Sequence, residues 1–591
     1  PGFIRALGTR SRFTASSVDQ FPRMMAAFLV YGSQFGWPIA DLERTDYFLV
    51  IGANPLVSNG SLMTAPGMRR RVRDIRARGG RVVVVDPRRS ETADAADEHV
   101  FLRPGTDAPF LLAMLSTIFA EGPVDLGVCD GRVDGLDHVR ELVAPYTPER
   151  VSDVTGVSAG TIRRLAREFA SASTGAAYAR IGTCVQSYGT LANYLVDVLN
   201  LVTGRLDRAG GVMFTTPAAG GTPARGHYGR WNSRTSGIPE FGGELPVATL
   251  AAEIETEGEG QLRGMFTLAG NPVLSTPNGA RLDAAMADLE FMVSVDPCMN
   301  ETTRHANVIL PPRSSLENPQ YSLVFLRLAV RNVAKVTDAV FEPREDSRSD
   351  WQILGALTEA LAELRERDGE GENDPAASVK PQYAYEPMQV IEGMLAAGPY
   401  DLSVDKLREH PSGMDLGPLQ EGRLDEIVAY EDGRLQLEHE VVDAELHRLE
   451  ADLEAGALVA GSDEMLLIGR RQLRSNNSWM HNCPSLMKGR DRCTLLVHPD
   501  DARRIGLGEG AHARVKSRVG ELEVPVEVTD EMMPGVVSLP HGFGHDRPGT
   551  RQRIAAQKAG VSMNDLTDET VVEGMLGTGV LTAIPVRVSV A

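Results

Sequence analysis

Two short loops in the sequence combine residue types that could hold a polar ligand. The first reads Gly-Ala-Asn-Pro and ends at Pro55, and the second reads Gly-Asn-Pro and ends at Pro272. Glycine lets a ligand approach the backbone closely, and the amide of Asn54 or Asn271 can both donate and accept hydrogen bonds. A single loop of this kind would be weak evidence, because an ordinary strand-to-helix turn would explain it better. Its recurrence favours a ligand-binding role.

Aspartates follow both loops at similar distances. Asp86 comes after the first loop and Asp296 after the second, and a third carboxylate, Asp107, lies in the turn Pro-Gly-Thr-Asp. An ionised carboxylate only accepts hydrogen bonds, so it suits a ligand edge with adjacent N–H donors, such as the N1–H and N2–H₂ edge of guanine. Structural alternatives stay open, because Asp107 could cap a helix and Asp86 could cap a helix or pair with Arg88.

Three arginines, Arg88, Arg89 and Arg103, lie between these aspartates and could bind a pyrophosphate. Such a site would have to be locally basic, because the formal net charge of the chain is −20.

The acidic balance argues against nucleic-acid binding, which relies on clustered lysine and arginine. Hydrophobic residues make up 42% and no apolar run reaches the length of a membrane helix, so we expect a soluble chain without a membrane span.

The cysteines and histidines offer little further chemistry. The five cysteines form no C-x-x-C pair, which favours a reducing, cytoplasmic location and excludes a compact cysteine-ligated cluster site within these residues. His541 and His545 are four residues apart, but Gly-Phe-Gly lies between them, so we expect no zinc site there. We expect His305 to support its surroundings by hydrogen bonding rather than to catalyse.

The elements that position these residues are predicted to be α/β units. Residues 47–51 and 81–85 read as buried strands on either side of a helix over 68–78, and residues 265–269 and 291–295 repeat this pattern around a helix over 280–288. We therefore predict two related, doubly wound α/β domains. Both loops would lie at the carboxyl ends of parallel strands, where open sheets bind ligands.

The rest of the chain divides around these units. Further helices are predicted over 111–119 and 190–203, a linker over 365–381, and an acidic amphipathic helix, either solvated or packed, over 431–456. Short strands with Gly or Pro turns follow from residue 464 and predict a C-terminal β-barrel domain. The predicted domains are 1–211, 212–460 and 461–591.

At this point the residues resemble a known family. The run FLVIGANP…RVVVVDPRRSETADAADEHVFLRPGTDA resembles the molybdopterin oxidoreductases of the dimethyl sulfoxide reductase type, which include formate dehydrogenases and nitrate reductases. The resemblance continues in the same order through LAGNPVLS…VSVDPCMNETTRHANVILPPRSSLEN and through HPDDARRIGLGEGAHARVKSRVGELEVPVEVTDEMMPGVVSLPHGFGH. It implies molybdenum, or tungsten, held by the dithiolenes of two molybdopterin guanine dinucleotides.

The resemblance also implies which residues bind this cofactor. Asn54, Asp86 and Asp107 match positions for one guanosine diphosphate arm, and the segment from Gly469 to Asn477 matches barrel positions that reach pterin or phosphate. For that asparagine-rich segment a purely structural turn is the alternative. The implied cofactor-binding residues are Gly52, Asn54, Asp86, Arg88, Arg103, Gly105, Asp107, Gly270, Asn271, Asp296, Glu301, Thr302, Thr303, Gly469, Arg470, Asn476, Asn477 and Asn564.

The chain departs from the family pattern at the protein ligand of the metal. The family carries Cys, selenocysteine or Ser in a run like S-R-L-C-x-S-S, and residues 11–17 read SRFTASS. Thr14 stands at the ligand position and is the predicted catalytic and metal-binding residue. A hydroxyl oxygen is a harder ligand than a thiolate and suits a high-valent oxo-metal, so a standard formate dehydrogenase or Cys-ligated nitrate reductase is less expected. The alternative is that Thr14 caps a helix near Val18 and the metal has no protein ligand.

The family often begins with a module that binds a 4Fe–4S cluster, and this sequence begins after that module would end. We therefore expect an N-terminally truncated fragment whose cluster, if any, lies in the missing part. The expected activity is a two-electron oxidation or reduction of a small substrate, with electrons passed to a redox partner protein or subunit. One alternative is a cofactor-free relative that acts as a scaffold subunit of an electron-transfer complex. A nicotinamide dehydrogenase is disfavoured, because no G-x-G-x-x-G fingerprint follows any strand.

Overall fold

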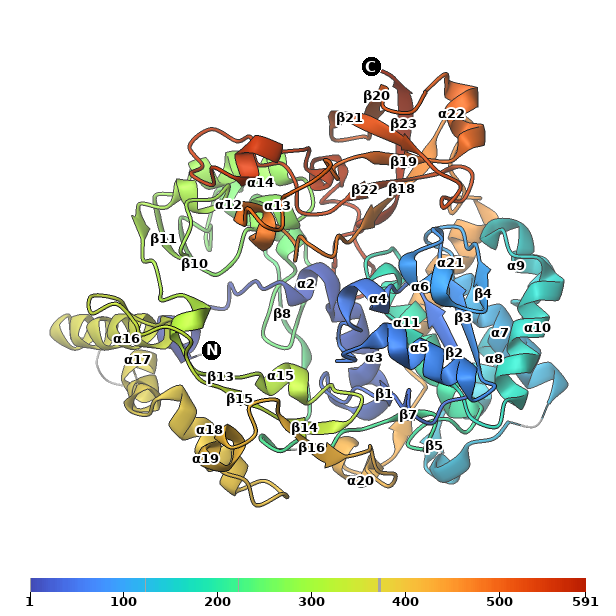
Figure 1. The fold of residues 1–591 in the computed structure, drawn as a ribbon, viewed down its shortest axis with the longest axis horizontal. Coiled ribbons are helices and arrows are strands. Elements are labelled where there is room, and N and C mark those ends of the chain that lie inside the picture. The colour runs from blue at the N-terminus through green and yellow to red at the C-terminus, as the bar shows by residue number, and fades with distance from the viewer. Residues whose placement is uncertain (1, 123, 222, 370–373) are drawn as a thin grey trace.

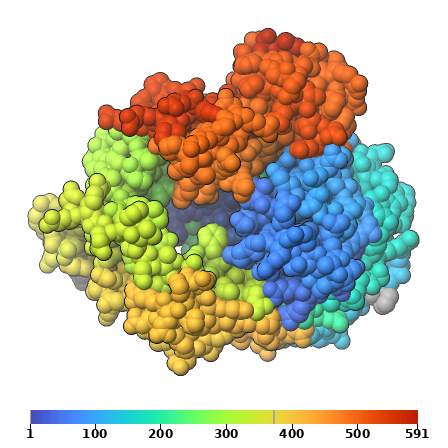
Figure 2. Space-filling view, viewed as in Figure 1, coloured from blue at the N-terminus to red at the C-terminus, as the bar shows by residue number. Residues whose placement is uncertain are grey.

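The computed structural model describes residues 2–122, 124–221, 223–369 and 374–591. Figure 1 shows a first α/β unit (blue to cyan), a smaller second α/β unit (green) and a C-terminal barrel (orange to dark red) that lies against both. Helices of residues 350–408 extend away from the barrel. In the space-filling view these parts surround a hollow at the centre of the face (Figure 2).

The first unit is built on a four-stranded parallel sheet with the strand order β4-β3-β2-β6. Every residue of β2 and of β6 is buried, as an all-apolar strand between two covered faces requires. The three main helices of the unit match the predicted ranges closely, and each has buried residues along its length. The strands of the sheet and these helices are β2 (Tyr47–Ile51), β3 (Arg81–Val85), β4 (Glu98–Val100), β6 (Ala176–Ala179), α5 (Met68–Ala77), α7 (Asp107–Glu121) and α11 (Gly189–Val202).

The second unit repeats this plan on a smaller scale. Its parallel sheet has three strands, β10 (Gly264–Leu268), β11 (Phe291–Val295) and β12 (Val308–Ile309), and α14 (Gly279–Ala287) connects the first two. The sheet is less well covered than the first, because Phe291 is 53% exposed at the start of β11. The two related parallel units predicted from the sequence are confirmed, and the second is the reduced copy.

The C-terminal strands close into a six-stranded barrel in the order β18-β22-β19-β21-β20-β23. Two of its strand pairs are parallel, β18 with β22 and β19 with β21. Between β22 and β23 the chain leaves the barrel and packs on the second unit, where Thr567 accepts a backbone hydrogen bond from Asn278 at 3.0 Å. The strands are β18 (Met465–Arg470), β19 (Leu495–Val497), β20 (His512–Lys516), β21 (Glu521–Val528), β22 (Val536–Pro540) and β23 (Thr582–Val590).

The acidic helix predicted over 431–456 is shorter in the structure, where α21 covers Glu440–Glu454 and the residues before it include the short strand β17 (Leu435–Gln436). Its residues Val442, Leu446 and Leu449 are buried in the core of the first unit, although the helix lies far along the chain.

The predicted linker over 365–381 is partly helical, because α16 (Asp350–Arg367) ends in it and α17 (Pro375–Val379) lies in it. Residues 370–373 of that linker lie outside the described residues. No helix in the described ranges has both the length and the apolarity needed to cross a bilayer.

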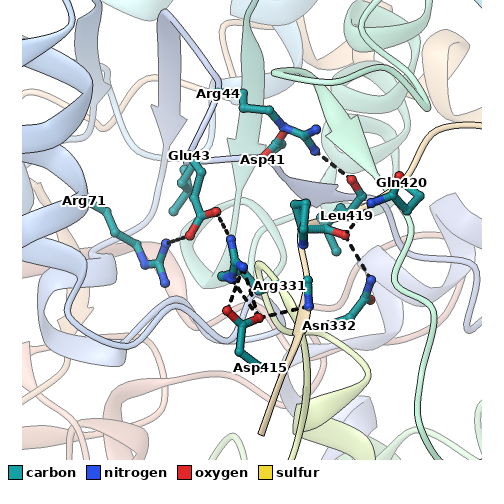
Figure 3. A network of polar contacts seen from close by, with 12 residues as sticks. Asp41, Glu43, Arg44, Arg71, Arg331, Asn332, Asp415, Leu419 and Gln420 are labelled. Atoms are coloured by element: carbon teal, nitrogen blue, oxygen red, sulfur yellow. Dashed lines mark hydrogen bonds and ion pairs between the residues drawn. The ribbon is translucent and has the colours of Figure 1, made fainter. Parts of the chain in front are cut away.

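A polar network joins the first unit to the short strands β14 (Asn332–Ala334) and β16 (Met414–Gly417) (Figure 3). Arg331 forms ion pairs with Glu43 of the first unit and, at 2.7 Å, with Asp415 of β16. Arg44 donates a hydrogen bond of 2.7 Å to the carbonyl oxygen of Leu419. These contacts tie residues distant in sequence to the edge of the first unit.

Candidate functional site

Two adjoining cavities lie where the two α/β units meet the barrel. Cavity A has a volume of about 100 Å³ and lies between the first unit and the barrel, whereas cavity B has a volume of about 220 Å³ and is also lined by the second unit. They share a wall, formed by Ile181, Gly182, Gly469, Arg470, Arg471 and Thr582.

Most of the predicted cofactor-binding residues line these cavities, and others support them from behind. Cavity A is lined by Gly52, Asn54, Asp86, Arg88, Arg103 and Asp107, cavity B by Gly270, Asn271, Asn477 and Asn564, and both by Gly469 and Arg470. The predicted residues outside the linings are Thr14, Gly105, Asp296, Glu301, Thr302, Thr303 and Asn476.

The first loop asparagine is held by two side chains that follow β3. Asn54 Nδ2 donates to Glu91 Oε2 at 2.7 Å, and Thr92 Oγ1 donates to Asn54 Oδ1 at 2.7 Å. The amide therefore has a fixed orientation before any ligand arrives. The loop also lies close to the turn that contains Gly182. A Cβ at Gly182 would lie 2.8 Å from the carbonyl oxygen of Gly52, so this position requires glycine.

The second loop repeats this arrangement with the same residue types. Asn271 Nδ2 donates to Glu301 Oε2 at 2.8 Å, and Thr302 Oγ1 donates to Asn271 Oδ1 at 2.8 Å. Glu301 and Thr302 are fully buried, so they position Asn271 rather than face the cavity. Glu91 and Thr92 were missed by sequence reasoning, although the Glu-Thr pair occurs once after each Asp-Pro and could have been found by aligning the two copies.

The aspartates after the strands also occupy equivalent turns. Asp86 Oδ1 accepts a hydrogen bond from the backbone N–H of Arg88 at 2.9 Å, and Asp296 Oδ1 accepts one from that of Cys298 at 2.7 Å. Burial raises the pKa of Asp86 to about 7, the bond from the Arg88 backbone opposes the rise, and the charge of Asp107 adds to it. Asp86 lines cavity A, and its carboxyl group accepts hydrogen bonds through both oxygens without donating one only when it is ionised.

Asp107 is the first residue of α7, directly after the N-cap residue Thr106. Its Oδ2 accepts a hydrogen bond of 2.8 Å from Gln186 Nε2, a partner that nothing in the sequence indicated. Burial raises the pKa of Asp107 to about 6. Cavity A thus contains a buried carboxyl group, Asp107, and a half-buried one, Asp86, and both have raised pKa values. A ligand that donates hydrogen bonds would favour their ionised forms.

The arginines around the cavities are already bonded to the protein. Arg88 pairs with Glu91 at 3.0 Å and with Glu531 at 3.2 Å rather than with Asp86. Arg103 donates to the carbonyl oxygens of residues 153 and 154 at the end of α9 (Pro148–Thr155). Arg470 donates to the carbonyl oxygen of Ser538 at 2.5 Å, and burial, with a smaller contribution from Arg88, lowers its pKa to about 10. These arginines supply positive potential at the cavities from fixed positions.

A buried hydrogen-bonded chain links the second unit to the barrel loop that carries Asn477. Glu301 Oε1 contacts His545 Nδ1 at 2.9 Å, His545 Nε2 contacts His481 Nδ1 at 2.8 Å, and His481 Nε2 contacts Ser475 Oγ at 2.7 Å. Burial alone would raise the pKa of Glu301, but the hydrogen bond and charge of His545 outweigh it and lower that pKa. Burial, with a smaller contribution from His545, lowers the pKa of His481 to about 4.

His305 is hydrogen-bonded, as the sequence analysis predicted. His305 Nε2 contacts Asp283 Oδ1 at 2.6 Å, which is the expected supporting role. Within the described residues, no group of three or more His, Cys, Asp and Glu side chains could hold a metal ion. Asn564, also predicted, is buried in the wall of cavity B and donates to the carbonyl oxygen of Leu274 at 3.2 Å.

The Thr14 side chain lines neither cavity. Its Oγ1 donates to Glu244 Oε2 at 2.5 Å and accepts from the backbone N–H of Ser16 at 3.1 Å, at the start of the short helix α2 (Ser16–Asp19). Service as a metal ligand would require the bond to Glu244 to break. The N-cap residue of α2 is Ala15, without a side-chain cap hydrogen bond, so Thr14 contacts the start of this helix without capping it in the usual way. Ala15 and Asp19 line cavity B instead, and Asp19 was missed by sequence reasoning.

Comparisons with protein families match both halves of the chain. Residues 5–360 match the model described as molybdopterin oxidoreductase, and residues 465–578 match the molybdopterin dinucleotide binding domain. The second match spans most of the strands and loops that supply the barrel side of both cavities, and it ends before Leu581 and Thr582.

Known proteins are similar over most of the chain. Dimethyl sulfoxide/trimethylamine N-oxide reductase of Rhodobacter capsulatus is 25% identical, over 99% of this chain and 76% of that protein. The F420-dependent formate dehydrogenase subunit alpha of Methanocaldococcus jannaschii is 24% identical, over 88% of this chain and 75% of that protein. The structure of acetylene hydratase from Pelobacter acetylenicus superposes with a TM-score of 0.75 at 18% identity, over 100% of this chain and 83% of that chain, which shows the common fold.

Proposed function

Because this chain belongs to the molybdopterin oxidoreductases of the dimethyl sulfoxide reductase family, we propose that it binds two molybdopterin guanine dinucleotides carrying molybdenum or tungsten. With them it catalyses the two-electron oxidation or reduction of a small substrate. The observation that carries the proposal is the duplicated support of Asn54 and Asn271, each held by a Glu-Thr pair beside one of two adjoining cavities.

The donor and acceptor groups present fit such a cofactor. In cavity A, Asp86 and Asp107 would accept hydrogen bonds from the N1–H and N2–H₂ groups of a guanine, and the Asn54 amide would contact the same arm. In cavity B, Asn271, Asn477 and Asn564 supply polar groups at the wall formed by the second unit and the barrel. The fixed charges of Arg88, Arg103 and Arg470 offset the phosphates in a protein whose net charge is −20.

The bound cofactor would supply the two-electron chemistry, and the protein's part is binding, orientation and exclusion of water. Cavity B suits the last task, because apolar side chains make up much of its wall: Val18, Ile181, Val185, Leu274 and Leu581. We propose that the electrons pass to or from a redox partner protein or subunit, in keeping with a relative described as the alpha subunit of a formate dehydrogenase.

Nucleotide binding tests the guanine assignment directly. Cofactor-free protein, purified from a host that cannot make the cofactor, is titrated calorimetrically with GDP and with ADP. We expect GDP to bind more tightly than ADP, because adenine lacks the paired N–H donors that two carboxylates accept. Asp107→Ala should weaken GDP binding by roughly 1.5–3 kcal/mol, a loss of about tenfold or more.

The matched control is Asp94→Ala, which removes an exposed aspartate from α6 (Glu91–Ala95) beside the same loop. It should leave GDP affinity unchanged. Equal affinity for GDP and ADP, or equal GDP affinity for wild type and Asp107→Ala, would contradict the role given to cavity A.

A further inference from the structure

A third cavity, cavity C, lies in the C-terminal domain and shares no lining residue with cavities A and B. Its volume is about 290 Å³, close to the lower end of small-molecule sites at roughly 300 Å³. Two loops form most of it, residues 487–493 before β19 and residues 557–560 between β22 and β23. The proposed function gives this cavity no role.

The inner wall of cavity C is apolar. Met487, Cys493 and Phe543 line it, and they form one buried cluster against which Ile554 packs. The Phe543 ring is held from behind by the ring of His481, with 4.3 Å between the two centroids. An aromatic ring beside a thioether is a favourable surface for a flat apolar group.

The same cavity is lined by three cations. Arg490, Arg492 and Lys558 contribute to its wall, and Asp491 is the only acidic residue of the described lining. Two of these cations are already paired with carboxylates, Lys558 with Asp491 at 2.9 Å and Arg490 with Glu527 at 3.5 Å. One positive charge, that of Arg492, is left over.

Arg492 makes only neutral contacts within the described part of the chain. Its guanidinium donates to the carbonyl oxygens of Leu486 at 3.1 Å and Lys488 at 3.0 Å, which leaves other N–H donors of the group available. Desolvation lowers the pKa of Arg492, and the positive charges of Arg474 and Arg490 lower it further. In a chain whose net charge is −20, a cation without a carboxylate partner beside a cavity indicates an anionic ligand.

We propose that cavity C binds a small aromatic carboxylate, with the carboxylate at Arg492 and the ring against Phe543 and Met487. A single negative charge fits, because the ion pairs leave a single cation unbalanced. The planar guanidinium suits the two oxygens of a carboxylate, and the apolar inner wall suits the ring. The inference does not depend on the proposed function, because cavity C is separate from the cavities assigned to the cofactor.

Methionine-methyl NMR tests the site directly on the purified full chain, with benzoate as the probe. Met487→Leu identifies the signal of Met487 among the 20 methionines. We expect benzoate to shift this signal saturably. Acetate lacks the ring and benzyl alcohol lacks the charge, so each should bind at least tenfold more weakly. A Met487 signal that ignores benzoate, or that responds equally to benzyl alcohol, would overturn the proposal.

A charge-removing variant tests the part played by Arg492. Arg492→Gln should weaken benzoate binding about tenfold or more, because it removes the charge-assisted hydrogen bonds. The matched control is Arg587→Gln, which removes an exposed arginine from β23 of the same barrel and should leave the affinity unchanged. The other methionine signals report whether each variant is folded. Equal benzoate affinity for wild type and Arg492→Gln would contradict the site, and the ligand comparison on wild type remains decisive if the variant fails to fold.

Discussion

Replacing Asp86 by asparagine should have opposite effects on stability and on nucleotide binding. Asp86 lines cavity A, and its one hydrogen bond within the turn comes from the backbone N–H of Arg88 at 2.9 Å. Asparagine can keep that bond through its own Oδ1, so the turn after β3 should survive. The substitution removes a half-buried charge, and it also removes an acceptor for the N–H groups of a guanine.

The magnitude follows from the pKa of the carboxyl. Burial raises the pKa of Asp86 from 3.8 to about 7, and each pH unit of this rise corresponds to about 1.36 kcal/mol. Because the folded-state value is the higher one, ionisation costs no stability below pH 3.8, costs more as pH rises toward 7, and reaches its full cost above that. The full cost is roughly 4 kcal/mol, and about half of that if solvent in cavity A screens the charge.

Thermal unfolding of cofactor-free protein as a function of pH measures this effect. At pH 8 Asp86→Asn should unfold at a higher temperature than wild type, and the difference should disappear as pH falls toward 4. The same variant should bind GDP at least tenfold more weakly at pH 8. Asp94→Asn, the exposed control, should change neither quantity. A variant that is less stable than wild type at pH 8, or a stability difference independent of pH, would refute the burial argument.

Two further substitutions test the contacts between the units. His545→Phe leaves the fully buried Glu301 without its histidine and should lower the free energy of unfolding by about 3–5 kcal/mol in urea titrations. Adding Glu301→Leu removes the unpaired carboxylate and should recover much of this loss. A double variant as unstable as the single one would show that shape rather than charge is responsible. Arg331→Met breaks the ion pairs with Glu43 and Asp415 shown in Figure 3, but Asp415 is 59% exposed, so the loss should be about 1 kcal/mol or less and should shrink in high salt. A much larger, salt-independent loss would indicate that the network holds the neighbouring strands in place.

The fold was predictable because its signals are local. Apolar runs such as residues 47–51 and 81–85 predict buried strands, and all of β2 and most of β3 are buried. The repetition of the Asn-Pro loop and the Asp-Pro turn identified two related units, and a complete alignment of the copies would also have added Glu91 and Thr92 to the predicted residues. The barrel followed from its short strands, but its parallel pairs did not, because pairing is decided by contacts between distant segments.

The direction in which side chains point was the part that sequence could not supply. Thr14 precedes one short helix and Asp19 ends it, yet Thr14 bonds Glu244 and lines neither cavity, whereas Asp19 lines cavity B. Gln186 reaches Asp107 from a distant segment of the first unit, and His545 reaches Glu301 because the C-terminal domain packs on the second unit. No periodicity within a segment encodes such long-range contacts. The assignment of individual cofactor-binding residues therefore stays a prediction for binding experiments to decide.

The central claim is that this protein holds two molybdopterin guanine dinucleotides and one metal. The most direct test is elemental analysis by plasma mass spectrometry, together with pterin fluorescence after denaturation, on protein from a host able to make the cofactor. The account predicts near-stoichiometric molybdenum or tungsten and about two pterins for each chain. Protein that is folded but contains neither metal nor pterin would contradict it and favour a scaffold role.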